Sequence, residues 1–134
     1  TKVYDQDNIE EWHKALQGCT LTSLDYTDCH KFGSPRSFAF LDPPYRGSFT
    51  QYGVDFNDQE QEKVIKLLND LTSSGSHAIM SNRDVGDGFF ESRQGDNDMA
   101  YFDVTYTAGR RKKNTDGTHS AKKAREILMI GKRT

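Results

Sequence analysis

Ser-Phe-Ala-Phe-Leu-Asp-Pro-Pro-Tyr, at residues 37–45, is the stretch that decides the fold. Its first five residues make a nearly continuous apolar run, which is typical of a strand buried on both faces of a parallel sheet. The run stops at Asp42, because Pro43 and Pro44 lack the N–H donors that a strand inside a sheet requires. Ligands bind at the carboxyl ends of strands in open α/β sheets, so the residues after this strand are the first candidates for a functional site.

The sequence on either side alternates between strand and helix patterns. Apolar spacing predicts helices over residues 7–16 and 58–73, strands over residues 20–26, 77–81, 101–107 and 126–131, and loops over residues 27–36, 46–57, 82–98 and 108–124. Asp7 and Asp58 are the predicted N-caps of the two helices. The last two strands are joined by a long excursion with no helix, which favours an antiparallel pair. The element order therefore predicts an α/β fold with an antiparallel edge hairpin.

The chain has the length of one small domain, 134 residues, and its net charge of −2 hides a split. Residues 1–107 carry 9 Lys and Arg against 18 Asp and Glu, whereas residues 108–134 carry 9 against 2. A basic tail on an acidic body predicts a polyanionic partner, with a solvated terminal segment as the alternative.

Composition also limits the compartment and the kind of site. No apolar run approaches the length of a membrane span, and the polar first ten residues are unlike a signal peptide, so we expect a cytosolic protein with no membrane partner. Cys19 and Cys29 show no paired metal-ligand spacing, and neither do the four histidines, so we interpret the cysteines as reduced thiols and predict no metal site.

The tetrapeptide Asp42-Pro43-Pro44-Tyr45 has the parts of a preorganised site. Pro43 restricts Asp42 to an extended backbone, and two consecutive fixed φ angles hold the acid and the ring in a rigid relation. A carboxylate, backbone carbonyls outside any ladder and an aromatic face would suit a planar base with an exocyclic amino group. The alternative is a strand that ends in a Pro-Pro turn with a surface tyrosine.

This tetrapeptide after an apolar strand resembles the motif of Dam-type DNA adenine-N6 methyltransferases. Three further segments are similar to segments of the carboxyl-terminal half of that family, and they come in the same order. The segments are Phe49-Thr50-Gln51-Tyr52 before a Gln-bearing helix, Ser81-Asn82-Arg83-Asp84 after the next strand, and the basic Arg110-Arg111 loop before Glu126-Ile127-Leu128. The resemblance extends over residues 18–132. The tetrapeptide alone also occurs in RNA methyltransferases, so the ordered set of segments carries the likeness.

The resemblance implies a partial Rossmann-like fold that uses S-adenosyl-L-methionine, and transfer of its methyl group to N6 of an adenine flipped out of double-stranded DNA. By that analogy Asp42, Pro43, Pro44 and Tyr45 are catalytic. Asp42 and the carbonyl of Pro43 would accept hydrogen bonds from the amino group, and Tyr45 would stack on the extruded base. Asp25, Tyr26 and Asp42 would contact the cofactor, with an ordinary acid at a strand end as the alternative for Asp25.

Three further groups of residues receive weaker roles from the same resemblance. Asn82 and Asp84 would line the target pocket or would be ordinary turn formers. Phe49 and Tyr52 would support the flipped base, although packing on their own loop is the favoured interpretation. The remaining candidates are basic, and we interpret them as DNA phosphate contacts rather than a solvated face: Arg110, Arg111, Lys112, Lys113, Lys122 and Lys123.

Two parts of a complete enzyme of this family are missing from the sequence, the glycine-rich Phe-x-Gly-x-Gly turn and most of the target-recognition segment. We therefore interpret residues 1–134 as the carboxyl-terminal part of a catalytic domain from a bacterial or phage-encoded cytoplasmic enzyme. The missing amino-terminal half or a second copy would be its partner, and the isolated chain would bind cofactor weakly and have little activity. Segment 20–26 should not pair directly with segment 37–41. The alternatives are a noncatalytic DNA-binding remnant and an RNA methyltransferase fragment.

Overall fold

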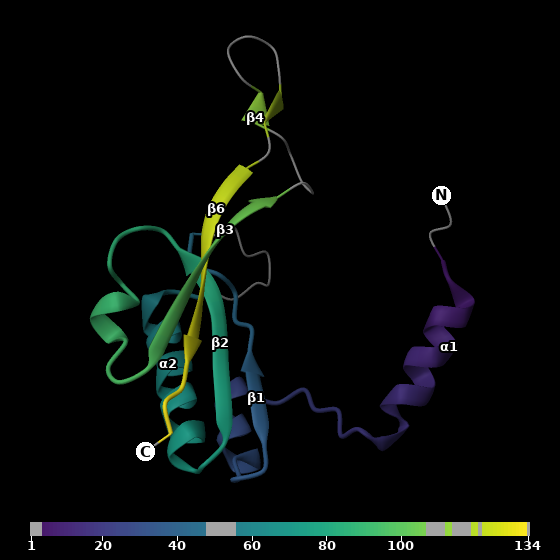
Figure 1. The fold of residues 1–134 in the computed structure, drawn as a ribbon. Helices are drawn as coiled ribbons and strands as arrows, with labels where there is room; N and C mark the ends of the chain where they lie inside the picture. The colour runs from purple at the N-terminus through teal and green to yellow at the C-terminus, as the bar shows by residue number, and fades with distance from the viewer. Residues whose placement is uncertain (1–3, 48–55, 107–111, 114–118, 121, 134) are drawn as a thin grey trace.

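The fold is organised around a four-stranded mixed sheet. The computed structural model describes residues 4–47, 56–106, 112–113, 119–120 and 122–133. The strands are β1 (Phe38–Leu41), β2 (His77–Asp84), β3 (Asp98–Tyr106) and β6 (Lys122–Ile130), and they lie in the order β1-β2-β6-β3 (Figure 1). β1 and β2 are parallel, whereas β6 is antiparallel to both of its neighbours. The predicted α/β fold with an antiparallel edge hairpin is confirmed.

A single long helix, α2 (Asp58–Ser73), covers one face of this sheet and builds the core. Its side chains at helical spacing are buried against inward-facing side chains of β2 and β6. The core residues in contact are Val64, Leu67, Leu68, Leu71, Ala78, Met80, Ile127 and Met129. The N-cap is Asn57 rather than the predicted Asp58, because its side chain accepts hydrogen bonds from the N–H groups of Gln59 at 3.0 Å and Glu60 at 3.2 Å.

The prediction that segment 37–41 is buried on both faces is wrong. Ala39 and Leu41 point toward α2, but Phe38 is 65% exposed and Phe40 is 54% exposed on the opposite face. The physical reason is that α2 covers only one side of the sheet, and no described element covers the other. The strand also lies at the edge of the sheet, since it pairs only with β2.

β2 and β6 are longer than the apolar pattern predicted. β2 continues through Asn82, Arg83 and Asp84, where the sequence pattern predicts a loop, because β6 pairs with it as far as Asp84 opposite Arg125. β6 begins at Lys122 instead of Glu126 for the same reason, since β3 pairs with it along its whole length. Backbone hydrogen bonds, and not side-chain polarity, set these limits. The segment 82–98 also contains a short 3₁₀ helix, η3 (Glu91–Arg93).

The predicted strand over residues 20–26 is absent from the structure. Residues 19–25 have no helix or strand, Leu21 and Leu24 are exposed, and a 3₁₀ helix, η2 (Tyr26–Phe32), follows where a loop was predicted. A strand needs a neighbour to pair with, and none of the described strands lies beside this segment. Because the segment forms no strand, the expectation that a strand over residues 20–26 does not pair with β1 stays a prediction.

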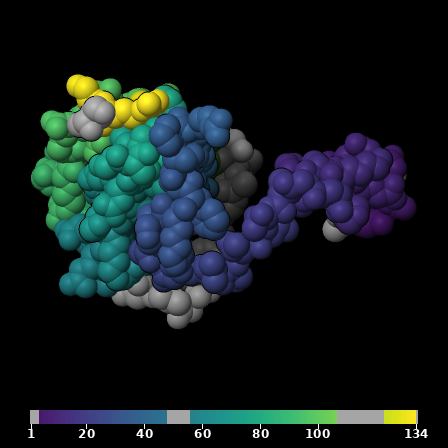
Figure 2. Space-filling view, turned by 90° about the horizontal axis from the view of Figure 1, so that it is seen from below, coloured from purple at the N-terminus to yellow at the C-terminus, as the bar shows by residue number. Residues whose placement is uncertain are grey.

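The first helix, α1 (Gln6–Ala15), matches the predicted helix over residues 7–16, but it packs on nothing in the described chain. Its N-cap is Asp5 rather than Asp7, and the 3₁₀ turn η1 (Leu16–Gly18) follows it. Figure 2 shows the helix standing apart from the body, to which an extended segment connects it. Trp12 is 62% exposed as a result. A two-residue antiparallel pair, β4 (Lys112–Lys113) with β5 (His119–Ser120), completes the described elements.

Candidate functional site

Asp42 lies at the carboxyl end of β1, where the two prolines end the strand. The parallel register places Leu41 beside Met80, and this brings Asp42 next to Ser81 of β2. The Ser81 hydroxyl donates a hydrogen bond to Asp42 Oδ1 at 2.8 Å. The carboxylate of Asp42 is exposed to solvent. The hydrogen bond from the buried Ser81 therefore orients a side chain that is otherwise open to water.

Two buried amide side chains hold the backbone around Tyr45. Gln61 of α2 donates from Nε2 to the carbonyl of Pro44 at 2.7 Å, and Asn82 of β2 donates from Nδ2 to Gln61 Oε1 at 2.8 Å. Asn82 Oδ1 accepts from the N–H of Arg46 at 3.0 Å and from the N–H of Arg83 at 2.8 Å. Gln61 and Asn82 are both 0% exposed. The residues after β1 are thus fixed from α2 and from β2.

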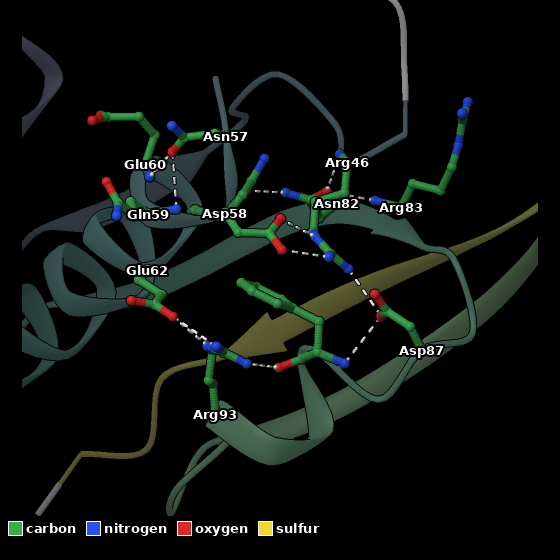
Figure 3. A network of polar contacts seen from close by, with 12 residues as sticks. Arg46, Asn57, Asp58, Gln59, Glu60, Glu62, Asn82, Arg83, Asp87 and Arg93 are labelled. Carbon is green, nitrogen blue, oxygen red and sulfur yellow. Dashed lines mark hydrogen bonds and ion pairs between the residues drawn. The ribbon is translucent and has the colours of Figure 1, made fainter. Parts of the chain in front are cut away.

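The side chain of Arg46 adds a second anchor (Figure 3). Its Nε and Nη2 donate to the two carboxylate oxygens of Asp58 at 2.7 and 2.8 Å, and Nη1 donates to Asp87 at 2.9 Å. The guanidinium carbon lies 3.9 Å from the ring centroid of Phe89, and that of Arg93 lies at the same distance. Hydrogen bonds from Arg46 lower the pKa of the Asp58 carboxyl and that of the Asp87 carboxyl.

Tyr45 is half-buried among polar groups of the sheet. Burial raises the pKa of its phenol, and a hydrogen bond with Ser81 acts in the opposite direction. Glu126 of β6 and Tyr106 of β3 also raise the pKa of Tyr45 through their charges. The Tyr106 hydroxyl donates to Glu126, and this bond is the main cause of the raised pKa of Tyr106. Tyr45 therefore belongs to the same group of side chains as Asp42 and Ser81.

A cavity of about 290 Å³ opens beside the motif, between η2, β1 and α2. Tyr26 and Asp42, two of the three predicted cofactor contacts, line it together with Pro43 and Pro44. The Tyr26 hydroxyl donates to Glu60 Oε2 at 2.7 Å, and burial is the largest cause of the raised pKa of Tyr26. Asp25, the third, does not line the cavity, and its carboxylate caps η2 by accepting from the N–H of Thr27 at 2.9 Å.

The residues with weaker predicted roles either lie away from an open pocket or fall outside the described residues. Asn82 lies beneath the motif, with its amide bonded to protein groups. Asp84 is buried, and its Oδ2 lies 2.7 Å from Nε of Arg125. Phe49, Tyr52, Arg110 and Arg111 lie outside the described residues.

The other basic candidates follow the hairpin of β3 and β6 past the end of β2. Lys112 and Lys113 form β4, and Lys122 and exposed Lys123 begin β6. Since Asp84, the last residue of β2, lies opposite Arg125, the start of β6 projects beyond the carboxyl end of β2 (Figure 1). This is the end of the sheet at which Asp42 lies.

Neither Gln61 nor Ser81 has a role that the sequence predicts. Gln61 had a usable signal, because it shares a helical face with Val64, Ile65 and Leu68, and a polar residue on an apolar face needs a partner. Ser81 had none, because its contact depends on the register of β1 with β2. In the described ranges no group of three or more His, Cys, Asp or Glu side chains could hold a metal ion, and no helix there is long and apolar enough to cross a membrane.

Comparisons with known proteins place these features in context. A family model for D12 class N6 adenine-specific DNA methyltransferases matches residues 1–87. The Type II methyltransferase M.MjaIII of Methanocaldococcus jannaschii is 26% identical over 135 residues, which cover 96% of this chain and 45% of that protein. The chain thus spans less than half the length of this relative. The crystal structure of a precorrin-8w decarboxylase from Methanobacterium thermoautotrophicum has a TM-score of 0.43 at 12% identity and covers 96% of this chain and 66% of that one.

Proposed function

The chain belongs to the family of D12 class N6 adenine-specific DNA methyltransferases, and we propose that it carries the catalytic, carboxyl-terminal part of such an enzyme. The reaction is transfer of a methyl group from S-adenosyl-L-methionine to N6 of an adenine in double-stranded DNA. The observation that supports this most strongly is the rigid Asp42-Pro43-Pro44-Tyr45 segment at the carboxyl end of β1, with its carboxylate oriented by Ser81.

The acceptors at this segment match the chemical problem of the reaction. The adenine amino group is a weak nucleophile, because its lone pair is delocalised into the ring. Asp42 and the carbonyl of Pro43 would accept its two N–H bonds and favour a reactive, pyramidal nitrogen. Ser81 holds Oδ1 of Asp42, and Oδ2 is the second acceptor of the exposed carboxylate. Tyr45 would stack on the flipped base, and contacts of this kind contribute about 1–3 kcal/mol per base.

The cavity of about 290 Å³ fits part of S-adenosyl-L-methionine. Its aromatic and proline lining, from Tyr26, Phe56 and Pro43, suits the flat adenine ring of the cofactor, and Asp42 at its rim suits the charged end. When bound, this cofactor supplies the methyl group as an electrophile. The glycine-rich turn that holds the rest of the cofactor in the resembled family is absent from this sequence. A partner, either the amino-terminal half or a second copy, would supply it.

Duplex DNA is the proposed substrate, and the basic residues around the β3–β6 hairpin are its proposed phosphate contacts. Lys112, Lys113, Lys122 and Lys123 belong to strands near or beyond the carboxyl end of β2, where a DNA backbone approaching Asp42 would pass. Such contacts position the duplex without reading its sequence.

Substitution Asp42→Ala in the full-length protein tests the proposed reaction. We expect the rate of transfer of labelled methyl groups to adenine in duplex DNA to fall by at least about 100-fold, while duplex binding persists, because the carboxylate acts on the reacting nitrogen. Asp98→Ala, an exposed acid at the start of β3, is the matched control and should leave the rate unchanged. Undiminished methylation by the Asp42 variant would reject the catalytic assignment. A wild-type protein that binds duplexes without methylating them would be a DNA-binding remnant, and methylation of RNA alone would favour the RNA enzyme.

A further inference from the structure

The backbone on both sides of Tyr45 is held by one buried pair of amides. The carbonyl before it, of Pro44, accepts from Gln61 at 2.7 Å, and the N–H after it, of Arg46, donates to Asn82 at 3.0 Å. A hydrogen bond of 2.8 Å from Asn82 to Gln61 joins the two side chains. The pair therefore connects α2, β2 and the catalytic segment through three consecutive hydrogen bonds.

We propose that Gln61 and Asn82 are positioning residues for the methyl-transfer site. They set the orientation of Tyr45 and turn the carbonyl of Pro44 into the protein, so that the carbonyl of Pro43 is the one presented to the adenine amino group. This inference rests on the proposed function, and it assigns these two residues no contact with the base or the cofactor.

The burial of Gln61 and Asn82 supports a role in orienting the backbone of residues 44–46. Both side chains are 0% exposed, and they share a face of α2 or β2 with Val64, Leu68 and Met80, all of which are buried apolar residues. Burying an amide is unfavourable unless its polar atoms are bonded, and here the amide oxygen and nitrogen of both residues have partners. A leucine would fill the same interior without that requirement. What an amide adds at each position is a bond of fixed direction to the backbone of residues 44–46.

The anchors around the pair make this a rigid arrangement. Arg46, whose N–H bonds to Asn82, is itself fixed through its guanidinium by Asp58 at the start of α2 and by Asp87 (Figure 3). Its guanidinium carbon also lies 3.9 Å from the Phe89 ring centroid. Tyr45 is thus bounded by a proline with a fixed φ angle on one side and by a doubly anchored arginine on the other. Loss of the amide pair would free the segment between these two anchors.

The test compares Gln61→Met, Asn82→Leu and Gln61→Glu in the full-length protein. We expect kcat to fall by about 10- to 100-fold in each, because small displacements of reacting groups have effects of this size. The dissociation constants for duplex DNA and for S-adenosyl-L-methionine should stay within about twofold, since the residues touch neither. Gln61→Glu keeps the shape of the side chain and an acceptor for the bond from Asn82, but it replaces the donor to the Pro44 carbonyl with a carboxyl oxygen. It therefore tests the bond to Pro44 at an unchanged side-chain volume.

Asn97→Leu is the matched control. Asn97 is another buried asparagine, bonded to Asn69 Oδ1 and to the carbonyl of Gln94, both at 2.9 Å, at the opposite end of the sheet from Asp42. Asn97→Leu should lower the free energy of unfolding as Asn82→Leu does, but it should leave kcat unchanged. Equal loss of stability with unchanged kcat in the Gln61 and Asn82 variants would overturn the proposal.

Amide hydrogen exchange separates this inference from the proposed function. Exchange of the Arg46 N–H should accelerate in the Asn82→Leu variant and stay protected in the Asn97→Leu variant, whether or not the protein methylates DNA. Unchanged protection of that N–H would exclude the amide pair as its anchor. Absence of methyl transfer by the wild-type protein, together with accelerated exchange in the variant, would reject the function and keep the structural link.

Discussion

Ser81 orients the proposed catalytic carboxylate, and it does so from a neighbouring strand. Its hydroxyl lies 2.8 Å from Asp42 Oδ1, and it also forms a hydrogen bond that influences the pKa of Tyr45. One small side chain therefore contacts both functional ends of the tetrapeptide. Because Asp42 is exposed, water can replace part of this contact when the hydroxyl is removed.

Removing the Ser81 hydroxyl should reduce activity less than removing the Asp42 carboxylate. For Ser81→Ala we expect kcat to fall by about fivefold, since a hydrogen bond of this kind contributes about 1 kcal/mol. Ser81→Thr retains a hydroxyl and should retain most of the activity. Steady-state methyl transfer at saturating DNA measures both variants. Equal kcat for Ser81→Ala and the wild-type protein would show that the carboxylate needs no orienting group.

The sequence was sufficient to locate Asp42 at the end of a strand, because prolines limit where a strand can continue. It was less accurate at the helix N-termini, where the caps are Asp5 and Asn57 rather than Asp7 and Asp58. Asp and Asn cap helices about equally well, so two such residues close together cannot be ranked by residue type alone. The partner of Ser81 depends on strand register, which no local pattern contains.

Arg46 and its acidic partners connect α2 to the segment that follows β1. The guanidinium is almost buried, whereas Asp58 and Asp87 remain exposed, so the contact resembles a cation held between two surface carboxylates and an aromatic ring. Hydrogen bonds from Arg46 hold the pKa of each carboxyl below its ordinary value of 3.8. The folded protein therefore binds protons at these two sites less readily than the unfolded chain does.

This difference predicts how acid acts on stability. The two lowered pKa values contribute to the free energy of unfolding. This contribution is complete above the ordinary carboxyl range, and it is lost as the pH falls through the lowered pKa values of the folded state. Arg46→Met should therefore lower the free energy of unfolding at neutral pH, and the gap from the wild-type protein should narrow below about pH 4. Urea unfolding of both proteins over a pH series measures this difference in free energy. Lys66→Met, which removes an exposed pair with Asp70, is the control and should change little at any pH. A difference in unfolding free energy between Arg46→Met and the wild-type protein that is constant with pH would contradict the assignment of the lowered pKa values to Arg46.

Helices and most strands could be predicted from apolar spacing, but their extents could not. β2 keeps its ladder through the polar residues 82–84 because β6 lies alongside, and segment 20–26 forms no strand because no described strand lies beside it. Pairing partners decide strands in both cases, and they come from elsewhere in the chain. The same reasoning explains why Gln61 and Asn82 were not recognised as a pair, since they meet only when α2 packs on β2.

At the scale of the whole molecule, the described residues cover one face of the sheet and leave the other open. Sheets with parallel strands usually have helices on both faces, but here α2 covers one side, and α1 stands apart from the body (Figure 1, Figure 2). Phe38, Phe40, Phe102 and Ile130 lie on the open side and are all exposed. The chain spans less than half the length of its relative M.MjaIII. The apolar residues 37–41 match the pattern of a strand buried on both faces, although only one face of β1 is covered by a described element.

The open face predicts that the 134-residue chain associates with itself when it is studied alone. Exposed aromatic side chains on an edge strand favour pairing between molecules, so light scattering should give a mass that rises with concentration above 15.2 kDa. The double substitution Phe38→Thr with Phe40→Thr keeps a strand-forming residue type but removes the apolar surface, and it should return the mass toward that of a monomer. Trp12→Ser on α1 is the control, because it removes an exposed aromatic side chain that lies away from the sheet. A monomer at all concentrations would contradict the prediction, and association abolished by Trp12→Ser alone would assign the contact to α1.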